Sequence, residues 1–430
     1  MDYQWHNRPM ATDPSTPLGR IVPRHASRAV GDALSDTRVV LVNGARQCGK
    51  STLVRLAGGD HVSWQTLDNE SSRRAAMADP TGFVDVDSAM IIDEIQRVPD
   101  LLLAIKERVD ADPRPGRFLL TGSARVLGLR TLPDALPGRM ETIELWPFSQ
   151  GEIDATPDRF VDAVFSLGPD LSHTSTVTRA EYAERVVRGG YPEAVARDQP
   201  RRRARFFDAY INDLISRDVS QLAEIERTGE MRALVRLLAA RSGHLLVASA
   251  LGNEVQLPHR TVSRYLHLLE EIFLIKRIPA WSRNLSARAT GTPKVAMVDS
   301  GIAANLLGAD AAQFKRPDSP FGPLLEGFVL MELARQLSWS EERVELSHYR
   351  TRDQVEVDAI LENRQGQVVG VEVKASATVR AEDFRGLRHL AERLAADFVV
   401  GIVLYTGDQT LQFGPRLRAM PISALWHAEP

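Results

Sequence analysis

Short apolar runs alternate with amphipathic segments over the first third of the chain. Continuous runs such as Val39–Val42, Met90–Ile92 and Phe118–Leu120 are typical of buried parallel strands, because both faces of such a strand are covered. Residues 99–110 place apolar side chains at helical spacing and predict a helix between two of these strands. Strands are also predicted at 62–67 and 142–145, and a short amphipathic helix at 21–34. The pattern indicates an α/β fold.

The pattern changes in the middle of the chain. Residues 154–178 are polar and gapped, which predicts an insertion or linker, and residues 201–219 predict an amphipathic helix. Between residues 231 and 278, two short helices, a turn, a third helix and a β-rich tail predict a winged helix-turn-helix. The last of these helices either reads DNA or serves only as a packing unit. Its expected outer face carries Arg260, Ser263, Arg264 and His267.

The last part of the chain returns to alternating helices and strands. A helix from Glu326 leads to strands at 345–350, 355–361 and 368–376, and a helix follows at 382–394. Glu372 and Lys374 are two residues apart on one strand, so they point to the same face, and a hairpin can bring Asp358 beside them. Two carboxylates and a lysine in this arrangement can hold a divalent cation while the lysine stabilises a phosphate under attack.

Composition narrows the class of protein. The chain is 43% hydrophobic and 25% charged, as ordinary globular cores are, and its 430 residues suggest two to four domains. A net charge of -3 excludes a uniformly basic nucleic-acid binder, so contact with DNA or RNA must come from a local patch such as Arg201–Arg205, which is otherwise a solvated helix start. No apolar stretch approaches the roughly twenty residues of a membrane span, and the N-terminus has no signal pattern. We expect a cytoplasmic protein without membrane contact.

The candidate chemistry begins directly after the first strand, where residues 44–52 read GARQCGKST and match G-x-x-x-x-G-K-[ST]. The glycines let backbone N–H groups surround phosphates, Lys50 supplies positive charge, and the Ser51 hydroxyl can ligate Mg²⁺. ATP and Mg²⁺ are therefore the predicted ligands; a solvated lysine beside a glycine turn is the alternative. The only cysteine, Cys48, either fits the loop as a small residue or is a redox site. The predicted binding residues are Gly44, Ala45, Arg46, Gln47, Cys48, Gly49, Lys50, Ser51 and Thr52.

Polar residues at the ends of two later strands complete this site. Asp93 and Glu94 follow Met90–Ile92, at the edge where open α/β sheets build their sites. Asp93 can hold Mg²⁺ and Glu94 can activate the attacking water, so the pair predicts hydrolysis. Thr121 and Ser123 follow the next strand, where they contact the terminal phosphate or merely end the strand in a polar turn. Asp68 is either a helix cap, for a helix over 70–77, or an accessory carboxylate.

Arg139 follows a Pro-Gly pair and precedes the predicted strand at 142–145. An arginine at the mouth of a subunit interface can stabilise charge on a neighbour's γ-phosphate. Arg139 is thus either a catalytic arginine acting between subunits or a surface arginine in a turn.

Five segments together carry a family resemblance: GARQCGKST, IIDEIQRVPDLL, FLLTGSARVL, PGRMETIELWPFSQGE and GGYPEAV. From about residue 20 onward the chain resembles the AAA-type ATPases of bacteria and archaea that carry a C-terminal nuclease-like domain of unknown function. The resemblance implies a P-loop ATPase core that is usually active between subunits, and hence a homo-oligomer. It assigns Lys50 and Ser51 to the Walker A motif, Asp93 and Glu94 to Walker B, and Thr121 or Ser123 to the first sensor. Arg139 resembles the second arginine of the finger region, although no arginine precedes Pro137-Gly138.

The C-terminal pattern resembles the PD-(D/E)xK nuclease core, with Glu326 matching the acidic residue of that core's first helix. The resemblance implies a restriction-endonuclease-like α/β domain in which Asp358, Glu372 and Lys374 are catalytic and Glu326, Asp358 and Glu372 bind metal. The alternative is the same fold retained for assembly or binding.

Two functions remain open at this point. The first is an ATP-hydrolysing AAA protein that acts on nucleic acid, with a metal-dependent nuclease domain; the second is an ATP-dependent regulatory switch or assembly protein whose nuclease-like domain binds a partner without cleavage. The expected domains are a loose tail at 1–19, the ATPase at 20–190, a helical and winged helix-turn-helix domain at 191–290, and the nuclease-like domain at 291–430.

Overall fold

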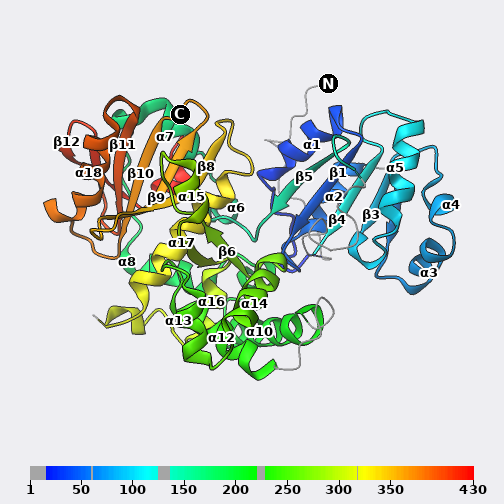
Figure 1. Cartoon of the computed structure of the whole chain (residues 1–430), viewed down its shortest axis with the longest axis horizontal. Helices are drawn as coiled ribbons and strands as arrows, with labels where there is room; N and C mark the ends of the chain where they lie inside the picture. The colour runs from blue at the N-terminus through cyan, green and yellow to red at the C-terminus, as the bar shows by residue number, and fades with distance from the viewer. Residues whose placement is uncertain (1–15, 60–61, 124–135, 220–227, 317) are drawn as a thin grey trace. The chain divides into compact units, whose positions relative to one another are not determined.

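The computed structural model describes residues 16–59, 62–123, 136–219, 228–316 and 318–430 (Figure 1). The chain divides into two compact units. We call residues 22–147 with 271–273 the N-terminal unit, and residues 148–270 with 274–430 the C-terminal unit. The sequence also predicts a short helix that begins near residue 132 and ends at Pro137-Gly138-Arg139; residues 132–135 of that stretch lie outside the described residues.

The N-terminal unit is built on a five-stranded parallel sheet of order β2-β3-β4-β1-β5. Because all five strands are parallel, their carboxyl ends meet at one edge of the sheet. The strands are β1 (Val39–Gly44), β2 (Ser63–Thr66), β3 (Met90–Asp93), β4 (Phe118–Gly122) and β5 (Met140–Leu145). The helices are α1 (Ala26–Asp36), α2 (Lys50–Gly58), α3 (Glu70–Ala78), α4 (Pro80–Val84) and α5 (Leu101–Ala111), with the 3-10 turn η1 (Ile95–Arg97).

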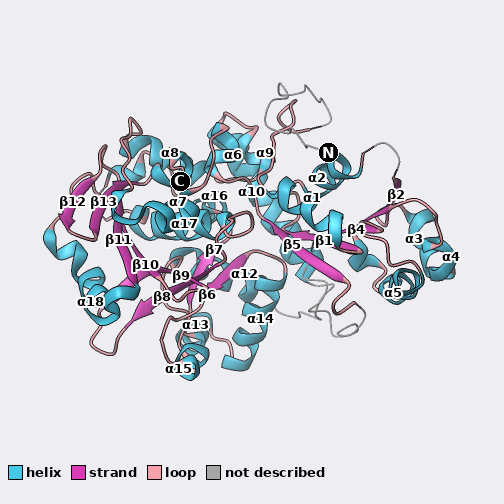
Figure 2. Cartoon of the chain, turned by 90° about the horizontal axis from the view of Figure 1, so that it is seen from above, coloured by secondary structure: helices cyan, strands magenta, loops and turns pink. Residues whose placement is uncertain are grey.

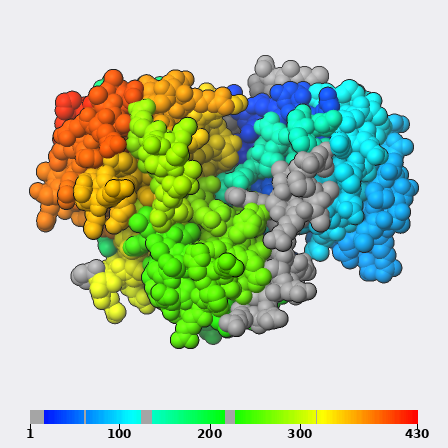
Figure 3. Space-filling view, in the orientation of Figure 1, coloured from blue at the N-terminus to red at the C-terminus, as the bar shows by residue number. Residues whose placement is uncertain are grey.

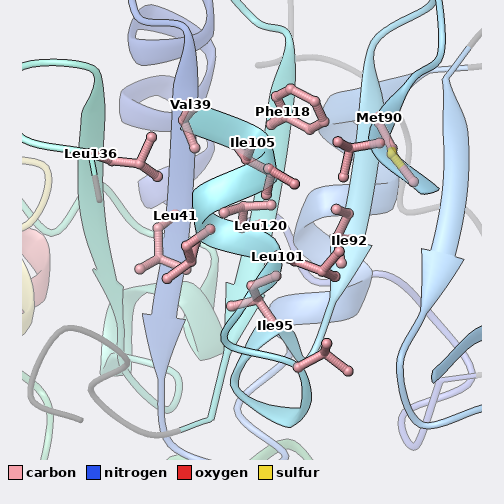
Figure 4. Packing of buried hydrophobic residues seen from close by; sticks show 14 of the residues in the cluster. Val39, Leu41, Met90, Ile92, Ile95, Leu101, Ile105, Phe118, Leu120 and Leu136 are labelled. Atoms are coloured by element: carbon pink, nitrogen blue, oxygen red, sulfur yellow. The ribbon is translucent and has the colours of Figure 1, made fainter. Parts of the chain in front are cut away.

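Successive side chains along a strand point to opposite faces of this sheet, and apolar side chains are buried on both faces. Val39 and Leu41 on β1 pack with Leu101 and Ile105 of α5 in one apolar cluster (Figure 4). Val40 and Val42, which point to the opposite face, are also fully buried. The apolar runs of the sequence therefore correspond to strands buried on both sides, as predicted.

Helices make up the middle of the chain. They are α6 (Gln150–Asp154), α7 (Phe160–Leu167), α8 (Arg179–Arg188), α9 (Pro192–Val195), α10 (Pro200–Asp213), α12 (Thr228–Ala240), α13 (Ala248–Val255), α14 (His259–Glu271), α15 (Leu285–Thr290) and α16 (Ser300–Leu306), with a π-helical turn η4 (Leu214–Val219) and a 3-10 turn η3 (Gly168–Asp170). Two short strands, β6 (Ile275–Ile278) and β7 (Lys294–Met297), pair antiparallel. Three helices, α12, α13 and α14, and the strand β6 occupy the region expected to be a winged helix-turn-helix, and β6 pairs with β7 beyond that region.

The C-terminal sheet is mixed and has the order β12-β13-β11-β10-β9-β8. Its strands are β8 (Val344–Arg350), β9 (Glu356–Asn363), β10 (Val368–Lys374), β11 (Phe398–Tyr405), β12 (Leu411–Gly414) and β13 (Leu417–Pro421). The helices are α17 (Phe321–Gln336), α18 (Arg385–Leu394) and α19 (Ala424–His427), and η5 (Gln313–Lys315), η6 (Ala381–Phe384) and η7 (Ala395–Asp397) are 3-10 turns. Leu387 and Leu390 of α18 pack on Val357 and Ile360 of β9, so α18 covers one face of this sheet. The two-stranded sheet lies beside β8 and β9 (Figure 2).

The stretch 154–178 was wrongly predicted to be an insertion or linker. Its segment 160–167 forms α7, in which Phe160 and Val161 have no exposed surface, and α7 contacts α17 and α19. Six of the eight residues of this segment are apolar, so the sequence carried a signal for a buried helix that the polar segments on both sides obscured.

The expected domain boundaries differ from the compact units. The N-terminal unit closes at Pro147 rather than at residue 190, and the boundary expected after residue 290 falls between the paired strands β6 and β7. Segments α10–α14 (green) and the C-terminal sheet (orange and red) belong to one packed unit (Figure 3). Among the described residues, no helix combines the length and the apolar character needed to cross a membrane.

Candidate functional site

The backbone of the loop between β1 and α2 restricts which amino acids can occupy it. Gln47 and Gly49 adopt positive φ angles of 61° and 100°. A Cβ on Gly44 would lie 2.0 Å from the carbonyl oxygen of Leu145, its neighbour on β5. Glycine at position 44 is therefore required by close backbone approach, and alternating backbone conformations in such a loop turn N–H groups toward a common anion.

Arg24 holds this loop through hydrogen bonds, a role that was not predicted from the sequence. Its guanidinium donates to the carbonyl oxygens of Cys48 at 2.8 Å and Trp146 at 2.7 Å. Cys48 is completely buried, and its thiol donates to the Leu145 oxygen at 3.3 Å. Burial raises the pKa of the Cys48 thiol, which keeps it in the unreactive protonated form. This environment favours the packing role of Cys48 over the redox role.

Lys50 opens α2 and is only 4% exposed, so the solvated-lysine alternative is wrong. Its ammonium donates to the carbonyl oxygens of Gly44 at 3.0 Å and Ala45 at 2.9 Å. The charge is therefore held inside the curve of the loop, where phosphates would approach.

Asp93 links three elements at the carboxyl edge of the sheet. Its Oδ1 accepts hydrogen bonds from the hydroxyls of Ser51 at 2.9 Å and Thr121 at 2.6 Å. The Thr121 hydroxyl also accepts from the backbone N–H of Glu94 at 2.9 Å. Ser51 and Asp93 thus stand together with oxygen donors suited to Mg²⁺, and the residues present fit the cofactor.

Glu94 leaves β3 with a left-handed backbone, φ 63°. Its carboxylate accepts a hydrogen bond from the Ser123 hydroxyl at 2.8 Å and another from the Gln96 side-chain amide. Gln96 also donates to Ser123 at 2.7 Å, so the three side chains form one network. Ser123 is therefore more than a polar strand end, and Gln96 is a site residue that the sequence reasoning missed.

Asp68 takes neither of the roles considered for it. The residue that caps α3 is Asn69, whose side chain accepts from the N–H groups of Ser71 and Ser72. Asp68 instead forms an ion pair with Arg97 at 2.5 Å. The cap prediction was wrong by one residue.

Arg139 lies at the edge of the sheet opposite its own phosphate loop. It precedes β5, whose first residue Met140 pairs with Val39 at the start of β1, whereas the loop follows the end of β1. Its guanidinium forms two contacts with Asp110 of α5, at 2.5 and 3.0 Å, and this hydrogen bonding lowers the pKa of Asp110. Arg139 can therefore act only on a nucleotide held by another subunit, and the finger assignment stays a prediction.

The second candidate site is a pocket of about 660 Å³ in the C-terminal unit. It gathers Glu326 from α17, Asp358 from β9, and Glu372 and Lys374 from β10. The Lys374 ammonium donates to Glu372 at 3.0 Å, and Asp358 Oδ2 accepts from the N–H of Val373 at 2.9 Å. The four predicted side chains thus line one pocket, as the sequence predicted.

A residue outside the predicted set occupies the centre of these carboxylates. The ammonium of Lys294, on β7, lies 2.7 Å from Glu326 Oε1 and 2.9 Å from both Asp358 Oδ1 and Glu356 Oε1. Among the described residues, no three His, Cys, Asp or Glu side chains are arranged to hold a metal ion. The predicted metal set of Glu326, Asp358 and Glu372 is therefore not arranged as a ligand set, because a lysine stands between two of its members.

Burial shapes the protonation of this pocket. It raises the pKa of Glu326 and of Glu372, and the neighbouring Asp358 raises both further. The coulombic attraction of Asp358, Glu326 and Glu356 outweighs burial for Lys294 and raises the pKa of its ammonium. This raised pKa favours the charged form of Lys294 beside the three carboxyl groups.

The helix α14, the third helix of the predicted winged helix-turn-helix, has the buried and exposed sides that the sequence predicts. Val262 and Leu266 are buried, whereas Arg260, Arg264 and His267 are exposed and Ser263 is half-buried. The basic start of α10 differs from expectation at one position, since Arg203 is buried and donates to the carbonyl oxygen of Arg197 at 3.1 Å. Arg201, Arg202 and Arg205 remain exposed.

Three families match consecutive parts of the chain. An AAA domain matches residues 36–154, and domains of unknown function, DUF8612 and DUF4143, match residues 179–313 and 321–425. The AAA match makes the N-terminal unit the core of a P-loop ATPase domain, whose ligand is a nucleotide that is usually bound with Mg²⁺.

An uncharacterized protein of Mycobacterium tuberculosis is 30% identical over 360 residues, which cover 83% of this chain and 74% of that protein. An uncharacterized protein of Haemophilus influenzae is 24% identical over 254 residues, 57% of each chain.

Solved structures resemble the chain weakly. A RuvB variant of Thermotoga maritima, 18% identical, covers 59% of this chain and 86% of its own, with a TM-score of 0.27. A signal-transduction ATPase with numerous domains from Pyrococcus horikoshii, 12% identical, covers 78% of this chain and 47% of its own, with a TM-score of 0.23. Likenesses of this size say nothing further about the chain.

Proposed function

We propose that this chain couples ATP hydrolysis to the binding of DNA or RNA without cutting it. The chain belongs to the family of AAA-domain proteins that carry two further domains of unknown function and include the mycobacterial relative. The observation that carries the ATPase half is the contact of Ser51, Asp93 and Thr121 beside Glu94. The nucleic-acid half rests on the exposed basic side chains of α14.

Each residue of the nucleotide site has one task in this proposal. Lys50 would bind the outer phosphates, and Ser51 with Asp93 would hold Mg²⁺, which when bound neutralises charge on the phosphates. Glu94 orients the attacking water and takes its proton. Thr121 fixes Asp93 and the backbone of Glu94 through its hydroxyl.

The two oxygens of the Glu94 carboxylate have different surroundings. Ser123 and Gln96 both donate to Oε2, and each such bond lowers the basicity of the carboxylate. These two contacts orient the side chain and leave Oε1 as the oxygen that would take the proton of the attacking water.

Nucleic acid is the partner class that the exposed cations favour. Arg260 and Arg264 lie one helical turn apart on the outer face of α14, the spacing at which both reach one phosphate backbone. A local patch of this kind is compatible with the net charge of -3. The subunits are expected to form a homo-oligomer, because Arg139 faces away from its own nucleotide.

The nuclease hypothesis is favoured by the convergence of Glu326, Asp358, Glu372 and Lys374, but the residues as arranged do not fit a metal. The pocket therefore binds a partner without cleaving it in this proposal. This choice corresponds to a nuclease-like domain used as a binding platform.

The test measures ATPase rate with and without DNA or RNA. We expect nucleic acid to change the rate, Lys50→Ala to abolish hydrolysis, and the double variant Arg260→Ala/Arg264→Ala to hydrolyse ATP but lose the response. Arg28→Ala, on the exposed surface of α1, is the matched charge control. An ATPase rate that nucleic acid does not change, or a double variant that responds to nucleic acid as the parent does, would refute the nucleic-acid half. Cleavage of the nucleic acid in Mg²⁺ or Mn²⁺ would refute the binding assignment.

A further inference from the structure

The strongest unexplained feature of the C-terminal unit is a lysine on an otherwise apolar strand. Lys294 begins β7, followed by Val295, Ala296 and Met297, and its side chain is 1% exposed. A lysine is almost never fully buried unless it is paired, and this one is paired with three carboxylates at once. The pairing joins three elements, β7, α17 and β9.

The ammonium fills the gap among the carboxylates that a divalent cation would have to enter. Glu326 and Asp358 are far apart in the sequence, and both contact Lys294 Nζ, at 2.7 and 2.9 Å. Mg²⁺ requires oxygen ligands at about 2.1 Å, whereas ammonium contacts are about 0.7 Å longer. One gap between the two carboxylates therefore holds one cation, and a second positive charge beside the first would be repelled.

The backbone keeps Lys294 in place. Val295, the next residue, donates to His244 at 3.0 Å and accepts from Gly243 at 2.7 Å, so β7 is held on one side by 243–245 and on the other by β6. Gly243 has φ 88°, and a Cβ there would lie 2.8 Å from the Glu326 carboxyl carbon. The segment is thus fitted closely around the Lys294–Glu326 pair.

One carboxylate oxygen is not used by this arrangement. Glu372 Oε2 is buried and, within the part of the chain that the structure describes, has no hydrogen-bond partner, while Glu372 Oε1 accepts from Lys374. Glu372, which lines the pocket, therefore keeps one oxygen for a hydrogen bond with a group that enters it.

We propose that the Lys294 ammonium is the resident cation of this pocket, so that the pocket works without a divalent metal. The inference rests on the proposed function, since it explains why a pocket with these carboxylates would bind and not cut. The pocket would then bind a group that donates hydrogen bonds to Glu372. The positive charge of Lys294 would screen that group from the other carboxylates.

Metal binding to the full chain tests this proposal without nucleotide or nucleic acid, so its failure is distinguishable from failure of the proposed function. All proteins carry Asp93→Asn, which removes the carboxylate expected to hold Mg²⁺ at the phosphate loop. Mn²⁺ binding is measured by titration calorimetry and by paramagnetic resonance. We expect no saturable site in this parent and none in Lys294→Arg, which keeps the cation.

Lys294→Met has nearly the same length and no charge. We expect it to gain one Mn²⁺ site, bound at least tenfold more tightly than any binding by the parent, and to be stabilised by Mn²⁺ in thermal unfolding while the parent is not. The gained site should disappear on adding Asp358→Asn. Lys374→Met, in the same pocket, should gain no site.

Two results would overturn the proposal. One is a folded Lys294→Met protein that binds no more Mn²⁺ than the parent. The other needs no lysine variant and therefore holds even if Lys294→Met does not fold: the parent binds Mn²⁺ and loses that binding with Asp358→Asn.

Discussion

At the scale of single residues, Glu94 is the group on which hydrolysis should depend most steeply. Its carboxylate is held by Ser123 and Gln96, next to the Asp93 network. Glu94→Gln keeps the side-chain shape and the Mg²⁺ ligands but cannot take a proton, so we expect turnover to fall by roughly 10²–10⁴ with nucleotide affinity nearly unchanged. Steady-state ATPase and binding of a fluorescent ATP analogue measure the two. Wild-type turnover in this variant would move the base elsewhere.

Gly44 tests whether the loop backbone is as restricted as its geometry indicates. An added methyl group would lie 2.0 Å from the Leu145 oxygen, so Gly44→Ala should push β1 and β5 apart, cost roughly 2–4 kcal/mol of unfolding free energy and abolish nucleotide binding. Gly31→Ala is the matched control, because nothing lies within 4 Å of its Cβ inside α1. That control should gain about 0.5–1 kcal/mol. Urea unfolding compares both; equal effects would contradict the close approach.

The residues that could be predicted from the sequence share one property: their roles follow from neighbours along the chain. Lys50 and Ser51 lie in a contiguous motif, and Asp93 comes directly after the apolar run Met90–Ile92, which predicts a buried strand. Arg24 and Lys294 were missed because each acts through partners 24 to 122 and 32 to 64 positions away. For Lys294 a signal existed, a single charge opening an apolar strand, but only the fold shows which carboxylates neutralise it.

At the scale of elements, the strand β8 carries a buried histidine that should make stability depend on pH. His348 donates from Nε2 to the carbonyl oxygen of Thr292 at 3.0 Å, and burial lowers its pKa to about 4. The unfolded chain, with a histidine pKa near 6.5, binds the proton more readily. The free energy of unfolding should therefore fall as pH drops from about 6.5 to 4, by up to about 1.4 kcal/mol per pH unit from this group.

The difference between the parent and His348→Gln isolates this contribution. Glu326 and Glu372, whose pKa values are raised by burial, act in the opposite sense, since their stabilisation is lost as pH rises through the folded-state pKa. Both proteins carry these carboxyls, so they cancel in the comparison. Urea unfolding at several pH values should give the variant a shallower loss on acidification, and parallel curves would show that His348 is not buried in its neutral form.

Elements were predicted well where one face or both faces are continuously apolar. The five strands of the N-terminal sheet and the helix α5 agree with the expected positions, and the AAA match covers them. The helix α7 was missed although six of the eight residues at 160–167 are apolar, because polar segments on both sides dominate the stretch 154–178. The boundary expected after residue 290 falls between β6 and β7. These two strands are paired, and β7 is also held by residues 243–245, contacts of which local composition carries no trace.

At the scale of the whole molecule, the question is whether ATP turnover needs more than one subunit. Arg139 stands at the sheet edge opposite its own loop and is paired with Asp110. If it stabilises charge on a neighbour's γ-phosphate, Arg139→Ala should leave ATP affinity intact and lower turnover by roughly 10³-fold or more. Asp110→Asn is the matched control, because it breaks the same ion pair but keeps the arginine, and it should retain turnover.

Mixing two inactive proteins separates action between subunits from a structural role of the ion pair. Lys50→Ala cannot bind ATP but keeps Arg139, whereas Arg139→Ala binds ATP but lacks the finger. If the arginine acts in trans, a mixed oligomer places an intact loop beside an intact arginine at some interfaces, and turnover should return in proportion to those interfaces. ATPase activity should also rise more than linearly with protein concentration near the assembly threshold. A protein that stays monomeric at full activity, or a mixture as inactive as its components, would leave Arg139 as a partner of Asp110 and nothing more.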